Sequence, residues 1–449
     1  MSNPSRKNSN LSLFIGLWMG LIVMAGAGVF GLIYWLSGSG AATAPAPTPP
    51  VTLATSVPTA LVTAPTTPPD VAVGGGEEQP PACNYPPNPA SGFGYGIQSH
   101  VFVGDNAYWI TLVRDKLHFQ WVKMQVRWDD LEKGPGQIFW DVLDSAMKEA
   151  CSNGLHVMLS VVAAPAWTLA NPLPAPEGQA APPDNYQGYA DFLAKLLDRY
   201  PGQIGAIEVW NEMNLEREWN TASGINPTEY VKMLATAHAA IKAKDSNVVV
   251  ISGAPSPTGI NCAGTFPECA GGRPIIVDDA TYLRQFVEAG GLQFADCIGT
   301  HSNGTNLPPT ADGTHPPGDA NAYTFKGPWN NPHYSWSLKS QVETYAQILN
   351  GQKPQCVTEF GYASAVDGKF PANYEFAADV SEQQQAQYLL EAFNWMRDSK
   401  LVKMAFLFNL DYGPKGNDPA SDDNVIFSIL KQDGSPRPAF DALSLMDKP

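Results

Sequence analysis

Two stretches of the chain decide its fold: residues 204–212 read IGAIEVWNE, and residues 355–361 read QCVTEFG. Each is a short apolar run that brings a carboxylate to its end, as expected for a buried strand of a parallel sheet. Six further runs of this type precede, separate and follow them. They begin near Phe93, Trp121, His156, Asn247, Ala295 and Lys403.

Amphipathic stretches with apolar residues at helical spacing lie between these runs. Clear examples are Tyr189–Tyr200, Thr228–Ala243, Leu338–Leu349 and Glu382–Arg397. Eight alternating strand and helix units over residues 91–449 predict an α/β fold, the (β/α)8 TIM barrel, with the helices as an outer ring. No glycine-rich phosphate loop follows the first run, which argues against a doubly wound nucleotide-binding sheet.

The N-terminal region has a different composition. Residues 11–36 carry no charged side chain and are long enough to cross a bilayer as a helix. Arg6 and Lys7 precede them, and no further Lys or Arg appears before Arg114. The positive-inside rule therefore predicts a signal-anchor at 11–36, a cytoplasmic N-terminus at 1–10 and an extracytoplasmic remainder in the cell membrane. Residues 37–90, rich in Pro, Thr and Ala, are expected to form a disordered linker.

A cleaved signal peptide is the alternative to this anchor. The small residues from Ala42 to Ala44 resemble a cleavage site, and cleavage near Ala44 would make the protein secreted. The apolar run is longer than the core of most signal peptides, which favours the anchor.

The net charge of −16 argues against a nucleic-acid partner, because phosphates require a basic surface. Six cysteines in an exported chain permit disulfides, and sequence cannot choose among their pairings. Cys262 and Cys269 are close enough along the chain to suggest a small loop disulfide. The cysteines and histidines lack the spacing of metal ligands, so no metal or other cofactor is expected.

The strongest chemical signal is the pair of carboxylates at two strand ends. Catalytic groups of such barrels project from the C-terminal ends of the strands, and here the fourth run ends at Glu212 and the seventh at Glu359. Two carboxyls, one protonated and one ionised, are what cleavage of a glycosidic bond requires. Glu208 shares strand parity with Glu212 and is expected lower in the barrel, in a structural role.

These motifs resemble glycoside hydrolase clan A. The sequence WNE at 210–212 and the sequence TEFG at 358–361 carry the resemblance, and VRW at 126–128 and WD at 140–141 extend it to the β-xylosidase-like and cellulase-like families. The resemblance implies hydrolysis of carbohydrate with retained anomeric configuration and no cofactor. It makes Glu212 the acid/base, Glu359 the nucleophile and Asn211 a hydrogen-bond donor to the sugar.

Two further residues receive roles from the same resemblance. Arg127, at the end of the second run, would help to keep Glu359 ionised, although an ion pair with Asp129 or Asp130 is an equally simple use for it. His301, at the end of the sixth run, would contact the substrate or the nucleophile.

The remaining candidates for substrate binding are aromatic or polar residues of the loops. Trp167 and Trp336 could stack on the apolar faces of sugar rings. The eighth run lacks the tryptophan that is usual in the clan and offers Asn409 and Asp411 instead.

Two other functions remain open. A cell-surface barrel that binds glycans without cleaving them would have the same fold, and a transglycosylase would share the covalent intermediate. The chain is expected to be a monomer, with the membrane and a β-linked oligo- or polysaccharide as its partners.

Overall fold

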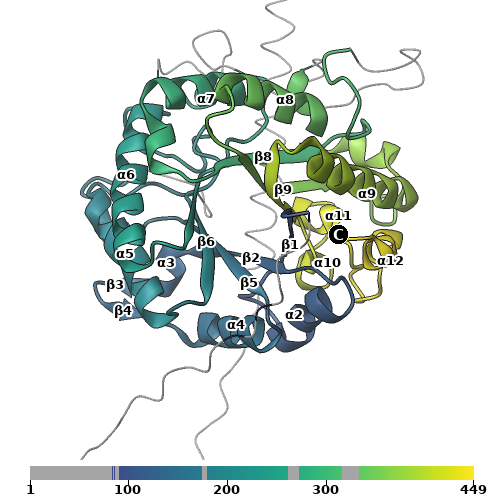
Figure 1. The fold of residues 1–449 in the computed structure, drawn as a ribbon, viewed down its shortest axis with the longest axis horizontal. Coiled ribbons are helices and arrows are strands. Elements are labelled where there is room, and N and C mark those ends of the chain that lie inside the picture. Colours follow the sequence, from purple (N-terminus) through teal and green to yellow (C-terminus); the bar gives the residue numbers. More distant parts are fainter. Residues whose placement is uncertain (1–82, 84, 86–90, 174–178, 261–272, 316–332) are drawn as a thin grey trace, which may run out of the picture. The chain divides into compact units, whose positions relative to one another are not determined.

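The computed structural model describes residues 83, 85, 91–173, 179–260, 273–315 and 333–449. These residues form an α/β barrel whose eight parallel strands are ordered β7-β6-β5-β2-β1-β10-β9-β8. A parallel bridge between Ile251 and Cys297 joins the outermost strands, β7 and β8, and closes the barrel. Figure 1 shows the strands at the centre and the helices around them.

Each of the eight predicted runs forms a strand of the barrel, so this prediction is confirmed. The strands are β1 Gly94–Gln98, β2 Trp121–Arg127, β5 His156–Val162, β6 Ile204–Val209, β7 Val249–Ser252, β8 Ile298–Gly304, β9 Gln355–Tyr362 and β10 Val402–Leu407. The sequence pattern did not predict the small antiparallel hairpin of β3 Glu132–Gly134 and β4 Gln137–Ile138.

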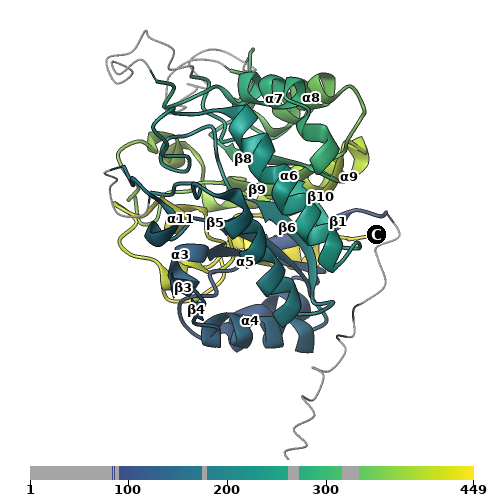
Figure 2. The ribbon, with the colours of Figure 1, turned by 90° about the vertical axis from the view of Figure 1, so that its left-hand side faces the viewer.

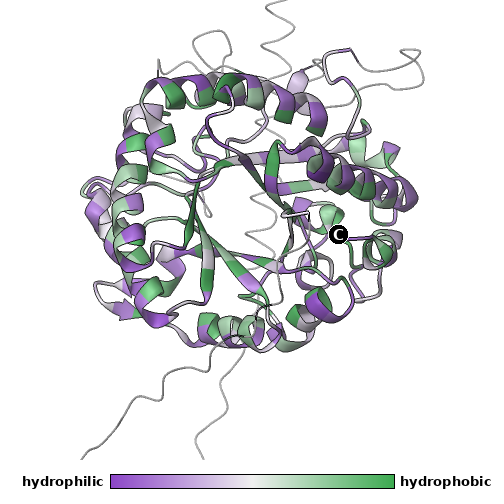
Figure 3. Ribbon diagram, viewed as in Figure 1, coloured by the Kyte–Doolittle hydropathy of each residue, from purple (hydrophilic) through white to green (hydrophobic). Residues whose placement is uncertain are grey.

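The outer ring consists of amphipathic helices whose apolar faces pack on the strands. They are α2 Asn106–Asp115, α4 Asp141–Ser152, α5 Tyr186–Arg199, α6 Pro227–Lys244, α7 Asp279–Glu288, α8 Leu338–Leu349, α9 Glu382–Ser399 and α12 Pro438–Leu445. Shorter helices lie in the loops: α3 Trp128–Leu131, α10 Tyr412–Lys415 and α11 Asp423–Phe427. Figure 3 shows largely hydrophobic strands and helices of mixed character, as this packing requires.

The interior of the barrel is layered. The part nearer the N-terminal ends of the strands is apolar and contains Met158, Ala206, Met404 and Phe406. Polar side chains, Lys123 and Glu208 among them, replace this packing nearer the C-terminal ends of the strands, although both are fully buried. A buried charged layer of this kind is costly unless its members pair, so it marks where a site should be sought.

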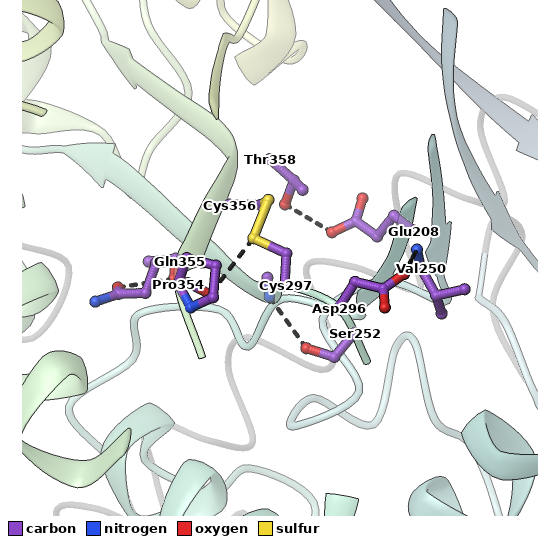
Figure 4. The surroundings of a disulfide bond; sticks show 11 residues. Glu208, Val250, Ser252, Asp296, Cys297, Pro354, Gln355, Cys356 and Thr358 are labelled. Carbon is purple, nitrogen blue, oxygen red and sulfur yellow. Dashed lines mark hydrogen bonds between the residues drawn. A yellow bond between two sulfur atoms is a disulfide. The ribbon is translucent and has the colours of Figure 1, made fainter. Parts of the chain in front are cut away.

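Two disulfides tie the described residues together. Cys297 and Cys356 join β8 to β9, as Figure 4 shows, and Cys83 is bonded to Cys151 at the end of α4. The predicted pair Cys262–Cys269 lies outside the described residues.

The predicted anchor at 11–36 also lies outside them, and among the described helices none is long and apolar enough to span a bilayer. Of the residues predicted as a linker at 37–90, the structure describes Cys83 and Tyr85, and both contact the barrel domain. Besides the disulfide of Cys83, the Tyr85 ring stacks on His156 at 4.3 Å between centroids, and the Tyr85 hydroxyl donates to the carbonyls of Gly202 and Gln203. These contacts are at the N-terminal ends of β5 and β6. Figure 2 shows the C terminus on the right.

Candidate active site

A cleft with a volume of about 680 Å³ opens at the C-terminal ends of the strands. Glu212 and Glu359 both line it, as do Asn211 and Trp336. Aromatic side chains from the loops after β9 and β10 form much of one wall: Tyr374, Phe376, Phe408, Tyr412 and Phe427. The cleft therefore combines an apolar surface with two convergent carboxylates.

Glu212 follows β6 in an unusual backbone turn. Trp210 and Glu212 have positive φ angles of 75° and 39°, which non-glycine residues seldom adopt outside sites that need them. The buried Trp210 indole donates to the carbonyl of Glu218 at 2.7 Å, and the Glu212 amide donates to the carbonyl of Ala254 at 3.0 Å. These bonds fix the Glu212 backbone and the start of the loop that follows.

Glu359 owes its direction to a β-bulge in β9. Val357 and Glu359 pair with the adjacent residues Thr300 and His301 of β8, and a matching shift in register occurs against β10. The extra residue is Thr358, so two consecutive side chains can face the barrel interior. Thr358 donates to Glu208 at 2.6 Å, as Figure 4 shows, while Glu359 reaches the cleft.

A buried lysine of β2, Lys123, contacts the candidate nucleophile Glu359. Lys123 Nζ lies 2.7 Å from Glu359 Oε1 and 3.5 Å from Glu208 Oε2, and it also donates to the carbonyl of Thr358. Lys123 has no solvent exposure. The positive charge of Lys123 therefore faces the carboxylate of Glu359 directly, inside the protein.

His301 links the two carboxylates. Its Nδ1 lies 3.1 Å from Glu212 Oε1 and 3.8 Å from Glu359 Oε2, and its Nε2 is 3.9 Å from Glu208 Oε1. Burial favours the neutral ring, but the charges of Glu359 and Glu212 outweigh burial and raise the His301 pKa. The ring therefore carries positive charge more readily than a free histidine.

Arg217 contacts Glu212 from the cleft side. Its guanidinium forms an ion pair with Glu212 Oε2, and its Nε is 3.9 Å from Glu218 Oε1. Although burial opposes ionisation of Glu212, Arg217 and His301 hold its pKa well below the usual range. Burial raises the pKa of Glu218 to about 7, against the opposing effect of Arg217.

Comparison with known proteins gives a match in fold alone. No family model matches the chain, and no curated protein matches it in sequence. Among solved structures, it is similar to a family 39 glycoside hydrolase from Bacteroides cellulosilyticus with a TM-score of 0.55 and 17% identity over 81% of this chain. A monomeric beta-xylosidase from Caulobacter crescentus gives a TM-score of 0.53 and 16% identity, covering 81% of this chain and 69% of that one.

The chain has the barrel fold of these glycoside hydrolases. It spans 65% of the length of the Bacteroides enzyme, slightly less than two thirds. It also resembles a family 10 endoxylanase from a sugarcane soil metagenome, with a TM-score of 0.50 and 12% identity over 79% of this chain and 97% of that one. The expected likeness to clan A barrels is therefore confirmed.

Within this glycoside hydrolase fold, the predicted site residues divide into two groups. Glu212, Glu359, Asn211 and Trp336 line the cleft, and His301 is fully buried between the two glutamates. The side-chain oxygen of Asn211 is buried and has no hydrogen-bond partner in the part of the chain that the structure describes.

Trp167, Asn409 and Asp411 are not among the residues of the cleft wall. The Trp167 side chain is 42% exposed, donates to the carbonyl of Glu132 and packs edge-on against Trp128. It therefore stabilises the loop after β5.

Asn409 and Asp411 are fully buried and hydrogen-bonded within the protein, which corrects their expected role in substrate binding. Asn409 donates to the carbonyl of Asn424 and accepts from the amide of Tyr412. Asp411 accepts from Ser99 and pairs with Lys415 at 2.6 Å. Both residues hold the loops that shape the cleft.

Arg127 also needs a correction. It pairs with Asp129 at 3.0 Å and lies 3.7 Å from Asp130, while the cation in contact with Glu359 is Lys123. Sequence reasoning missed Lys123, although strand alternation places it on the same side of β2 as Arg127. Arg217 and Glu218 were also missed, and no pattern in their loop distinguishes them.

One group of side chains outside the cleft has the composition of a metal site. Ligand atoms of Asp278, Asp279 and His333 lie within 4.8 Å of one another. Hydrogen bonds within the protein explain the group: His333 Nε2 lies 3.0 Å from Asp278, and Tyr345 and Gln341 donate to Asp279. We therefore regard it as a clasp that joins α7 and α8 to the loop before α8.

Proposed function

We propose that the chain is a retaining glycoside hydrolase that cleaves β-linked oligo- or polysaccharides. The observation that carries this proposal is the arrangement of Glu212 and Glu359 around one His301 nitrogen. The distances of 3.1 Å and 3.8 Å limit the separation of the two carboxylate oxygens to 6.9 Å or less. Retaining enzymes need carboxyls about 5–5.5 Å apart, which this limit allows, and inverting enzymes about 6.5–9.5 Å, a range that the limit excludes for the most part.

In this mechanism Glu359 attacks the anomeric carbon while a protonated Glu212 donates its proton to the leaving glycosidic oxygen. Lys123 holds the Glu359 carboxylate in position through the contact at 2.7 Å. Glu212, now a carboxylate, then takes a proton from the water that attacks the covalent glycosyl ester, which releases the sugar and restores both groups.

The aromatic wall supports a carbohydrate substrate. Phe408 contacts Tyr412 and Phe427 in tilted and edge-on arrangements, so the wall is a packed surface on which the apolar face of a sugar can lie. Phe408 occupies the place at the end of β10 where the clan usually has a tryptophan.

We further propose that the barrel is extracytoplasmic and tethered by residues 11–36. The two disulfides of the described residues support export, because such bonds persist in oxidising compartments. Labelling intact and permeabilised cells with an impermeant reagent tests this. Labelling of the barrel only after permeabilisation would refute it.

The catalytic proposal is tested with the full-length protein on aryl β-xylosides, β-glucosides, β-galactosides and β-mannosides, and on plant and microbial polysaccharides. We expect cleavage of at least one substrate, a first product of retained configuration by NMR, and loss of activity in Glu359→Ala. Azide should partly restore the activity of Glu212→Ala, and the product of that reaction should be a β-glycosyl azide. Glu229→Gln is the control, since Glu229 is on α6 outside the cleft wall and pairs with Lys232.

A wild-type protein that binds these glycans without cleaving any of them would support a glycan-binding scaffold. Transfer of the sugar to an added acceptor in preference to water would identify a transglycosylase.

A further inference from the structure

Both carboxylate oxygens of Glu212 are occupied. Oε1 is 3.1 Å from His301 Nδ1, and Oε2 is paired with Arg217. An acid catalyst must place a protonated oxygen within hydrogen-bonding distance of the leaving glycosidic oxygen. One of the two partners must therefore move before Glu212 can act.

Arg217 is the partner that is free to move. His301 is fully buried on β8, which is disulfide-bonded to β9, whereas the Arg217 side chain is 58% exposed. The backbone of Arg217 is held, because its carbonyl accepts from Ala180 at 2.7 Å and the preceding amide donates to Ile275 at 2.8 Å. Movement can thus be confined to the Arg217 side chain.

Glu218 is the second carboxyl within reach of this guanidinium. Its Oε1 is 3.9 Å from Arg217 Nε, its side chain is only 16% exposed, and its carbonyl is held by the Trp210 indole. Burial raises the pKa of Glu218 to about 7, so below that pH it holds a proton while Arg217 is on Glu212. The other charged or titratable groups that face these three are Arg127, Lys123, His301, Glu359 and Tyr374.

We propose that Arg217 is a positioning residue that exchanges between Glu212 and Glu218 and so determines which of the two carboxyls carries the proton. In the resting state Arg217 pairs with ionised Glu212, and Glu218 is neutral. When a substrate enters, Arg217 moves to Glu218, which releases its proton to the cleft, while Glu212 takes one up. The net charge is unchanged, and Glu212 becomes the acid that the proposed function requires.

The exchange can be tested without a substrate, by NMR titration of the full-length protein carrying glutamate labelled with carbon-13 at the side-chain carboxyl. In Glu212→Gln, Arg217 should move to Glu218 and lower its titration midpoint by about one pH unit or more. Comparing Arg217→Met with Glu212→Gln/Arg217→Met isolates the simple loss of the Glu212 charge, because both variants lack Arg217, and the fall between these two should be much smaller. Equal falls with and without Arg217 would overturn the proposal, and Glu229→Gln, which removes a carboxylate of α6 that pairs with Lys232 outside the cleft wall, should leave the midpoint unchanged.

The pH profile of kcat/KM tests the same exchange on whichever aryl β-glycoside the wild type cleaves. In Glu218→Gln, Arg217 has no alternative partner, so the basic limb should move to lower pH by about one unit and the rate at pH 7 should fall roughly tenfold. Arg217→Met should move the limb to higher pH, and the double variant should follow Arg217→Met. Lower rates with unchanged limbs would show a purely structural role. A wild type that cleaves nothing refutes the proposed function, while the titration still decides the exchange.

Discussion

The two sides of the cleft hold their carboxylates in different ways. Glu359 lies on β9, which a disulfide joins to β8, and its cation Lys123 is fully buried. Glu212 follows the end of β6 in a left-handed turn, and its cation Arg217 is largely exposed. The nucleophile has to stay ionised, whereas the acid/base changes its protonation twice in each turnover, so a fixed cation suits the first and a movable cation the second.

The first prediction concerns the side of the cleft where the buried Lys123 holds Glu359, and the variant that tests it is Lys123→Met. It leaves Glu208 and Glu359 buried without their shared cation, and breaking a buried ion pair in this way costs about 3–5 kcal/mol. We also expect kcat to fall on the order of 100-fold or more, because Glu359 loses the contact that holds its carboxylate in position. Urea unfolding and steady-state kinetics measure both effects. The control Lys133→Met removes an exposed pair with Asp130 and should change little; normal activity in Lys123→Met would refute the role of Lys123.

The next largest effect on stability is expected from removing the disulfide between Cys297 and Cys356, in the variant Cys297→Ala/Cys356→Ala. For a sequence separation of 59 residues, the loss of chain restriction predicts a destabilisation of about 4 kcal/mol. Cys83→Ala/Cys151→Ala, with a separation of 68 residues, should cost a similar amount. The comparison predicts that only the first pair lowers kcat, measured well below the melting temperature. Equal kcat values would show that the disulfide does not hold Glu359 and His301 in place.

On the side of the cleft where the exposed Arg217 pairs with Glu212, Glu218→Gln should change how the free energy of unfolding depends on pH. The Glu218 pKa is raised from 4.5 to about 7 in the folded protein, so between these values the folded state binds more protons than the unfolded state. Its contribution to stability is therefore complete below pH 4.5 and is lost as the pH rises to 7, by on the order of 2–3 kcal/mol. Urea unfolding from pH 4 to 8 should show a smaller decline in the variant. Parallel curves would contradict the raised pKa.

The smallest expected effect concerns the rim of the cleft. Trp167→Ala should change kcat/KM by less than about twofold, because the indole packs on Trp128 outside the cleft wall. Phe408→Ala, which removes part of the aromatic wall, should raise KM about tenfold. Substrate affinities of the two variants, measured side by side, would show whether the wall is assigned to the correct residues.

Much of this architecture was predictable from the sequence because strand ends carry periodic signals. The eight strand runs were located correctly, and Glu212, Asn211 and Glu359 were placed at the cleft from their positions at strand ends. The same reasoning could have identified Lys123, since alternation along β2 gives it the orientation of Gln125, which lines the cleft.

Other features depend on tertiary contacts that have no local signal. Arg217 and Glu218 belong to an irregular loop, and their meeting with Glu212 depends on the turn at Trp210 and on bonds from distant loops. Asn409 and Asp411 have the residue types of a substrate site, yet both satisfy buried backbone and side-chain groups. Residue type at a strand end therefore does not distinguish a side chain that faces the cleft from one that supports its wall.

The attachment of Cys83 to Cys151 has a mechanical consequence. This bond and the Tyr85 contacts are at the end of the barrel opposite the cleft, ahead of β1 in the chain. A pulling force on the N-terminal segment therefore enters the domain at Cys83 and passes to α4 through a covalent bond. Strand β1 lies outside that path, so a pull on the N-terminal segment is not transmitted to the barrel through its first strand.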